Sequence, residues 1–270
     1  MPLEYTTARY TAARERLIFA MDVPHPIHAL KLARGQTQEG LAAHVGMFKV
    51  GLELFMAGGP EIVKMLGELR PIMLDLKLHD IPETVARAVS VAGDLGVKFL
   101  TLHVQQRETL LKASLAAKKY PDMTLLGVTV LTSMSSDDLV DLEEQVPSSL
   151  GSGTTDRTRH YDIALRINSL AKLAYASGIH GFVCSPKDAR ALRDALPSHE
   201  TMVLPKPIIV TPGITPGTET RDHKRSASPA EAIEAGADYL VVGRPIRDAR
   251  DPAAAADAVV KEIAGALVPA

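Results

Sequence analysis

Short runs of aliphatic and β-branched residues alternate with longer segments of helical periodicity along the chain. In the longer segments apolar residues recur every three or four positions, as at Val85, Val89, Ala92 and Leu95, which places one apolar stripe on a helix. The short runs predict about eight strands. They are Leu17–Val23, Val45–Val50, Ile72–Lys77, Phe99–Val104, Leu125–Leu131, Gly181–Cys184, Pro207–Thr211 and Tyr239–Val242.

Repeated strand–helix units with nearly continuous apolar strands are typical of a parallel sheet buried on both faces. The pattern alone fits an open doubly wound sheet as well as a closed barrel. No Pro/Gly-rich linker divides the chain, so residues 17–270 are expected to form a single α/β domain after an N-terminal extension, residues 1–16. We expect the extension to fray, and the alternative is an amphipathic helix across the bottom of a barrel.

One low-complexity segment, Pro147–Thr158, interrupts the alternation after the fifth strand. It predicts a long mobile loop, and a surface insertion is favoured over a substrate lid. The helical segment Asp137–Glu144 belongs to the same insertion.

The composition narrows the classes of partner. The chain of 270 residues carries 30 Lys and Arg against 32 Asp and Glu, and 4% of its residues are aromatic. It therefore lacks the clustered positive charge and stacking platforms of a nucleic-acid surface, although small anions stay possible ligands. No apolar run approaches a membrane span, no Cys/His cluster has zinc-ligand spacing, and the single Cys184 cannot form an intramolecular disulfide. We expect a cytoplasmic protein.

The end of the third strand carries charges in an otherwise apolar run. Asp75 and Lys77 share one face of the strand, and Asp80 follows in the loop beyond its carboxyl end, where barrel active sites gather. Lys and Asp are seldom buried without partners, so the pair is either a structural ion pair or a catalytic arrangement.

Two further charges end the first two strands, Asp22 and Lys49. If both point into one cavity at the carboxyl ends of the strands, Lys49, Asp75, Lys77 and Asp80 form a network of alternating charges. In such a network each charge holds its neighbours ionised. A fixed ammonium among carboxylates suits the stabilisation of a carbanion.

The last two strands end in Thr211-Pro212-Gly213-Ile214 and Gly243-Arg244. Glycine lets backbone N–H groups approach an anion, a following helix N-terminus adds a favourable dipole, and an arginine forms charge-assisted hydrogen bonds. These features predict a phosphate site at Gly243 and Arg244, with tight strand–helix turns as the alternative.

Hydroxyl and imidazole groups end the fourth and fifth strands. Thr132 and Ser133 can hydrogen-bond the edge of a heterocycle or cap the following helix, and the residues do not decide between these roles. His103 faces either the mouth or the core.

Asp75-x-Lys77-x-x-Asp80-Ile81-Pro82-x-Thr84 resembles the signature of the orotidine 5′-phosphate decarboxylase family. Further segments, between roughly Leu17 and Ile263, match in family order. They are Ala20-Met21-Asp22, Phe48-Lys49-Val50-Gly51, Val128–Met134, Gly181–Pro186, Thr211–Ile214 and Val242–Ile246.

The resemblance implies a dimeric (β/α)8 barrel with its sites at the subunit interface, which converts orotidine 5′-phosphate to uridine 5′-phosphate and CO2 without metal or organic cofactor. It implies that Lys77 donates the proton and that Asp75 lies beside the substrate carboxylate. The resemblance also implies the remaining roles. Lys49 and Asp22 contact the ribose hydroxyls, Asp80 with Thr84 reaches the partner subunit's site, and Thr132 and Ser133 meet the pyrimidine. Gly243 and Arg244 bind the phosphate, the positions of Thr215 and His223 lie near it, and Ile81, Pro212 and Gly213 are further substrate-binding residues.

Two of these positions depart from the family pattern. Thr215 stands where an arginine is usual, and His223 stands where a glutamine is usual. Losing a guanidinium weakens phosphate binding unless another cation replaces it. Our hypothesis is that Arg221, Lys224 or Arg225 reaches inward instead.

Two competing functions stay open. The first is a similar magnesium-dependent barrel enzyme, such as 3-keto-gulonate-phosphate decarboxylase or hexulose-phosphate synthase, against which the Ile81-Pro82-x-Thr84 continuation and the Leu131-Thr132-Ser133 strand end speak. The second is a catalytically silent nucleotide- or phosphate-binding relative, against which the intact charged residues speak.

Overall fold

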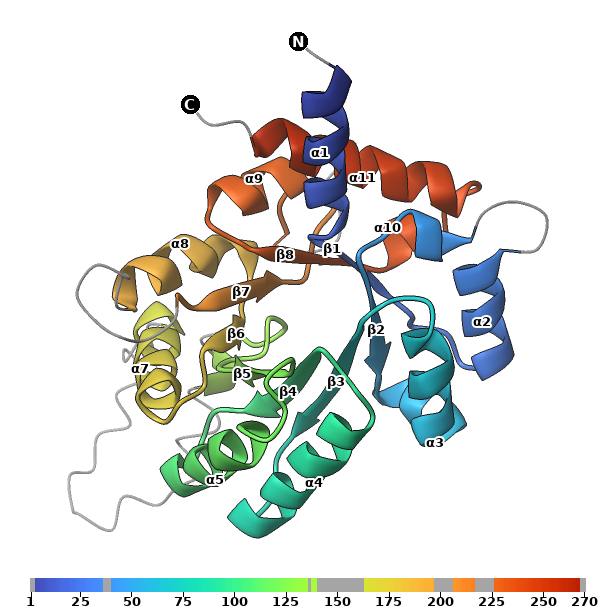
Figure 1. The fold of residues 1–270 in the computed structure, drawn as a ribbon. Coiled ribbons are helices and arrows are strands. Elements are labelled where there is room, and N and C mark those ends of the chain that lie inside the picture. Colours follow the sequence, from blue (N-terminus) through green and yellow to red (C-terminus); the bar gives the residue numbers. More distant parts are fainter. Residues whose placement is uncertain are drawn as a thin grey trace.

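The computed structural model describes residues 3–35, 40–135, 137–139, 163–196, 206–216 and 226–267. Its eight strands form a closed parallel barrel in which each strand pairs with the next and β8 pairs with β1 (Figure 1). The strands are β1 Leu17–Ala20, β2 Met47–Gly51, β3 Ile72–Leu78, β4 Phe99–His103, β5 Thr124–Val128, β6 Gly181–Val183, β7 Ile208–Thr211 and β8 Tyr239–Val242. The predicted strands are all confirmed, with ends that differ by at most three residues.

Helices surround the barrel and cover the outer face of the sheet (Figure 1). Proline occupies the first turn of several of them, where its missing N–H costs no hydrogen bond. The helices are α1 Leu3–Arg14, α2 Pro26–Arg34, the 3-10 turn η1 Leu41–Ala43, α3 Leu52–Gly67, α4 Pro82–Asp94, α5 Arg107–Ala117, α7 Ile163–Ala176, α8 Pro186–Ala195, α9 Pro229–Glu234, α10 Arg244–Arg247 and α11 Pro252–Ala266. Among the described residues no helix is both long enough and apolar enough to cross a bilayer.

Alternation along each strand divides the apolar residues into two cores. One lies between the sheet and the helices, and the smaller one fills the inside of the barrel. The inner core contains Ile18, Ala20, Met47, Met73, Phe99, Leu126, Val128, Val183, Val210 and Val241. It closes the barrel from within and leaves its upper residues as an apolar floor beneath the mouth.

The described part of the N-terminal extension is helical and not frayed as expected, and its helix α1 packs against α11 (Figure 1). Arg9 donates from Nη2 to the carbonyl of Gly265 at 3.1 Å, and the Tyr10 hydroxyl donates to the carbonyl of Asp257 at 3.2 Å. Ala13 is fully buried.

The predicted insertion falls largely outside the described residues. Pro147–Thr158 lies there entirely, and of the segment Asp137–Glu144 only residues 137–139 are described, which are helical. The surface-insertion hypothesis therefore stays a prediction.

Candidate active site

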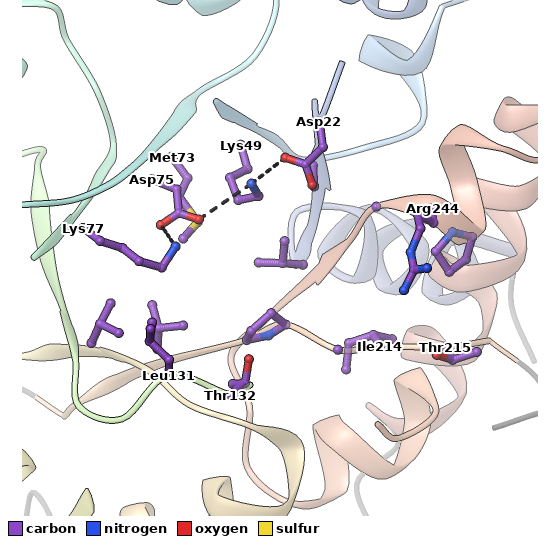
Figure 2. A pocket seen from close by; sticks show the side chains of 18 of the residues that line it. Asp22, Lys49, Met73, Asp75, Lys77, Leu131, Thr132, Ile214, Thr215 and Arg244 are labelled. Atoms are coloured by element: carbon purple, nitrogen blue, oxygen red, sulfur yellow. Dashed lines mark hydrogen bonds and ion pairs between the residues drawn. The ribbon is translucent and has the colours of Figure 1, made fainter. Parts of the chain in front are cut away.

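A cavity of about 720 Å³ opens at the carboxyl ends of the strands (Figure 2). Its floor is the upper part of the inner core, and its walls come from the loops that follow the strands. It is lined by Ala20, Asp22, Lys49, Met73, Asp75, Lys77, Val128, Val130, Leu131, Thr132, Val183, Pro212, Gly213, Ile214, Thr215, Val241, Gly243, Arg244, Pro245 and Asp248.

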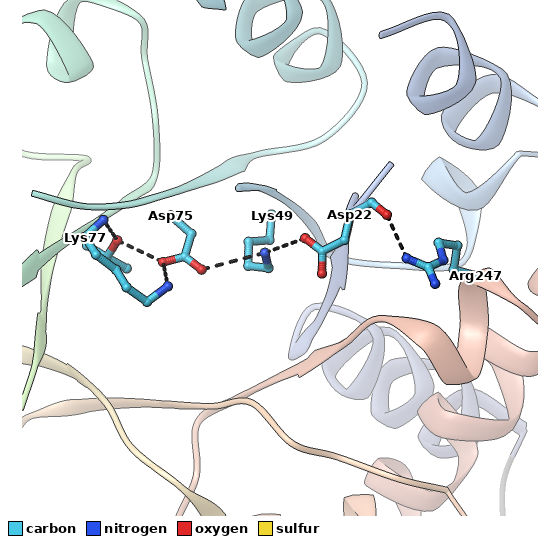
Figure 3. A network of polar contacts seen from close by, with 6 residues as sticks. Asp22, Lys49, Asp75, Lys77 and Arg247 are labelled. Carbon is cyan, nitrogen blue, oxygen red and sulfur yellow. Dashed lines mark hydrogen bonds and ion pairs between the residues drawn. The ribbon is translucent and has the colours of Figure 1, made fainter. Parts of the chain in front are cut away.

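Four charged side chains of alternating sign run along one side of this cavity (Figure 3). Lys77 Nζ lies 2.7 Å from Asp75 Oδ1, and Lys49 Nζ lies 3.6 Å from Asp75 Oδ2 and 2.8 Å from Asp22 Oδ1. Each carboxylate therefore touches a lysine, and each lysine touches a carboxylate. Lys77 lies on the same strand as Asp75, and Lys49 reaches Asp75 from the neighbouring strand β2.

Burial differs along this chain of charges. The side chains of Asp75 and Lys49 are 12% and 11% exposed, that of Lys77 is 32% exposed, and that of Asp22 is 49% exposed. Burial disfavours ionised Asp75, but Lys49, Lys77 and the hydrogen bonds to its carboxylate outweigh it and hold the pKa of Asp75 below its usual value. Asp75 is thus a fixed negative charge beside the ammonium of Lys77.

Lys77 has an unusual backbone. Its φ of 49° lies in the left-handed region, and it is the one non-glycine residue of the described chain with a positive φ. The β3–β4 ladder shifts register there, between the pairs Leu74–Leu100 and Leu78–Leu102. A strained backbone at a charged, cavity-facing lysine is typical of a functional site.

The opposite side of the cavity is formed by the ends of β7 and β8. Gly213 has a φ of 78°, a backbone conformation in which a residue with a side chain would be strained. Arg244 begins α10 immediately after Gly243 (Figure 2). The backbone N–H of Thr215 donates to the carbonyl of Ala227 at 3.0 Å, which holds the start of the β7 loop. Pro212, Gly213, Thr215, Gly243 and Arg244 line the cavity together, and their predicted contacts with a phosphate stay a prediction.

Asp80 is not part of the charged network, contrary to expectation. It is exposed, and its Oδ1 accepts a hydrogen bond from the backbone N–H of Ile81 at 2.6 Å. No ion pair joins it to a lysine within the described part of the chain. Asp22 takes the fourth place through its contact with Lys49. Asp80, in the loop after β3, is not among the residues that line the cavity.

Other predicted residues are divided between the cavity and the surface. Thr132 lines the cavity, whereas Ser133, Ile81 and Thr84 do not. Ile81 is 63% exposed, although its side chain is apolar. His223 lies outside the described residues.

His103 ends β4 and is half-buried, and its ring centroid lies 5.6 Å from that of His79. Burial lowers the pKa of His103, and the positive field of His79 and Lys77 adds to the effect. His103 is not among the residues that line the cavity. The described residues contain no group of three or more His, Cys, Asp or Glu side chains placed to hold a metal ion.

Two residues of the site were absent from the expectations. Thr101, fully buried on β4, donates from its hydroxyl to Asp75 Oδ1 at 3.0 Å. Arg247 donates from Nη1 to the backbone carbonyl of Asp22 at 2.7 Å (Figure 3). A hydroxyl at an inward position of an apolar strand is the one sequence signal that points to Thr101, and nothing in the local sequence points to Arg247.

Comparison with known proteins gives consistent matches. The model of the orotidine 5′-phosphate decarboxylase / HUMPS family matches residues 15–259. Orotidine 5′-phosphate decarboxylase of Rhodopseudomonas palustris (strain ATCC BAA-98 / CGA009) is 41% identical over 255 residues, 94% of this chain and 95% of that protein. The enzyme of the same name from Anaeromyxobacter sp. (strain K) is 41% identical over 247 residues, 91% of this chain and 96% of that protein. The crystal structure of orotidine 5′-phosphate decarboxylase from Lactobacillus acidophilus has a TM-score of 0.70 and 33% identity, and covers 92% of this chain and 98% of that one.

Proposed function

The chain belongs to the orotidine 5′-phosphate decarboxylase / HUMPS family, and from this membership we propose that it decarboxylates orotidine 5′-phosphate to uridine 5′-phosphate and CO2 in the cytoplasm. This reaction is the last step of de novo uridine 5′-phosphate biosynthesis. The observation that carries the proposal is the cavity-facing Lys77–Asp75 pair, at 2.7 Å, at one end of a chain of alternating charges.

The reaction needs a cation where negative charge develops. When the bond between pyrimidine C6 and the carboxylate carbon breaks, CO2 leaves and the electron pair stays on C6. The preorganised ammonium of Lys77 stabilises this carbanion and donates a proton to C6, and the lysine regains a proton from water. Asp75 lies beside the departing carboxylate and holds Lys77 in place.

The remaining cavity residues bind the parts of the substrate that do not react. Lys49 and Asp22 contact the ribose hydroxyls, and Thr132 contacts the pyrimidine. Gly213 and Gly243 let backbone N–H groups approach the phosphate, and Arg244 supplies a charge-assisted contact, a role supported by its place in the cavity wall. Binding energy from the phosphate then stabilises the closed site around the reacting bond.

The altered phosphate loop calls for a compensating cation. Thr215 lines the cavity but carries no charge where an arginine is usual. We retain the hypothesis that Arg221, Lys224 or Arg225, all outside the described residues, reaches the phosphate. Changing the three to Ala, singly and together, is expected to raise the KM for orotidine 5′-phosphate, and an unchanged KM in every variant would refute it.

We also propose a homodimer with shared sites. Asp80, Ile81 and Thr84 do not line the cavity of their own chain, and the exposed apolar Ile81 is suited to burial by a second copy. The test mixes Lys77→Ala with Asp80→Asn after dissociation and reassociation. If each site needs both residues from different subunits, random mixing restores about a quarter of the sites in a two-fold symmetric dimer. No recovery would contradict the shared site.

The decisive assay follows the ultraviolet loss of orotidine 5′-phosphate, with and without a metal chelator. Chelator-resistant turnover is expected, and Lys77→Ala is expected to abolish it while uridine 5′-phosphate still binds. Turnover of a sugar phosphate that requires magnesium would favour the alternative enzymes of this barrel family. Tight binding of uridine 5′-phosphate without turnover by the unaltered protein would favour a silent binding protein.

A further inference from the structure

Thr101 occupies a position at which a hydroxyl needs partners. It lies in the middle of β4, points into the barrel on the same face as Phe99, and is 0% exposed. It does not line the cavity, but it contacts two charged residues that do, Asp75 and Lys77. Burying a hydroxyl among apolar residues is unfavourable unless it is hydrogen-bonded. Its bonds therefore show what the position requires.

The hydroxyl of Thr101 joins the backbone of one active-site residue to the side chain of another. It accepts a hydrogen bond from the backbone N–H of Lys77 at 2.9 Å and donates one to Asp75 Oδ1 at 3.0 Å. The directions are determined, because an amide N–H only donates and an ionised carboxylate only accepts. Asp75 Oδ1 also accepts a hydrogen bond from the ammonium of Lys77, so two donors meet at this one oxygen.

The backbone irregularity of β3 depends on the same contact. Because Leu74 pairs with Leu100 and Leu78 with Leu102, three residues of β3 stand opposite Thr101 alone. The backbone N–H of Lys77 donates to the threonine hydroxyl at that point, where the regular ladder is interrupted. A lysine keeps a left-handed backbone conformation only where the surrounding structure holds it, and the hydrogen bond to Thr101 is one such restraint.

We propose that Thr101 is a positioning residue, whose hydroxyl sets the backbone of Lys77 and the carboxylate of Asp75 at a fixed separation so that the ammonium points into the cavity. Its effect on turnover rests on the proposed decarboxylase function. The restraint itself is a property of the free protein.

The test compares Thr101→Ser with Thr101→Cys, which differ in one atom. Serine keeps a full hydroxyl, whereas a thiol is a weak donor and acceptor. Misplacing a reacting group by a fraction of an ångström to 1 Å costs up to about 10²-fold in rate. We expect kcat to fall by about ten- to a hundredfold in Thr101→Cys and Thr101→Val, with KM within about threefold of the original value. Thr101→Ser should recover most of kcat.

The matched control is Thr109→Val. Thr109 is also a buried threonine, 5% exposed, and its hydroxyl donates to the side chain of Gln106 at 2.9 Å, on α5 and away from the cavity. This variant loses one buried hydrogen bond without touching Lys77 or Asp75. Its kcat should equal that of the unaltered protein.

A second readout does not depend on turnover. The carboxyl of Asp75 is titrated by carbon-13 NMR in the free protein, where it faces Lys49 from β2, Lys77 on its own strand and His103 from β4. Removing a hydrogen bond to an ionised carboxylate raises its pKa. The pKa of Asp75 should therefore be higher in Thr101→Cys than in Thr101→Ser.

The outcomes separate the two proposals. An unchanged kcat and an unchanged Asp75 titration in folded Thr101→Cys would overturn the positioning role. If the unaltered protein fails to turn over orotidine 5′-phosphate but the titration shifts as expected, the restraint stands and the proposed function fails. If Thr101→Val does not fold, the serine and cysteine variants still decide the question.

Discussion

Gly51 has no side chain, which leaves room for the charged side chains of Lys49 and Asp22. It is the last residue of β2 and the N-cap of α3, and a Cβ at this position would lie 3.1 Å from Lys49 Nζ and 3.4 Å from Asp22 Oδ1. Its φ of −92° is open to any residue, so Gly51→Ala adds a contact without backbone strain. Since non-bonded atoms settle at roughly 3.5 Å, Lys49 Nζ has to move by about 0.4 Å.

Lys49 cannot make this movement freely, because it lies between Asp22 at 2.8 Å and Asp75 at 3.6 Å and its side chain is 11% exposed. If a misplacement of 1 Å costs about 10²-fold and the logarithm scales with distance, 0.4 Å costs about sixfold. We therefore expect Gly51→Ala to lower kcat/KM for orotidine 5′-phosphate by about sixfold, measured by the ultraviolet assay.

The control is Gly67→Ala at the other end of α3. A Cβ there would lie 3.7 Å from Ile72 Cγ1, an ordinary contact, so kcat/KM should be unchanged. The reasoning is refuted if folded Gly51→Ala has the same kcat/KM as Gly67→Ala. That result would mean that the site tolerates displacement of Lys49.

Two further predictions concern Asp75 and Arg247. Because the pKa of Asp75 is lowered in the folded protein, its ionisation stabilises the fold above the usual value of 3.8, and this stability is lost as pH falls through the folded pKa. The measurement is the free energy of unfolding, from urea titrations, of the unaltered protein and of Asp75→Asn. The difference between the two should become smaller below about pH 4, and a difference that does not change with pH would contradict this. Arg247→Ala frees the carbonyl of Asp22, so we expect KM to rise by about three- to tenfold with a smaller change in kcat. Equal KM values in steady-state assays would show that the contact does not position Asp22.

The periodicity of the chain predicts the strands and predicts that the main charged residues lie on one face of the sheet. Alternation along β2 and β3 is enough to bring Lys49 and Asp75 to one face, and the order of the strands makes them neighbours. The closed barrel itself follows from the resemblance rather than from the pattern, because an open sheet buries its strands in the same way.

The interruption of β3 was not predictable from periodicity. Asp75 and Lys77 are two positions apart, as in a regular strand, so the sequence contains no sign that three residues stand opposite Thr101. Nor does local sequence specify the path of the loop after β3, which carries Asp80 outward. Arg247 contacts a residue 225 positions away, and only the closed barrel brings these two together.

The pairing of β1 with β8 determines the order in which the barrel can be completed. Leu17 and Leu240 are register partners, so the first strand to leave the ribosome gains its second neighbour only after the last strand has been synthesised. Until then the nascent sheet has two open edges, which are sites of mispairing, and contacts this distant in sequence form slowly. Chains that terminate before Tyr239 therefore cannot close the barrel and are expected to aggregate or to be degraded.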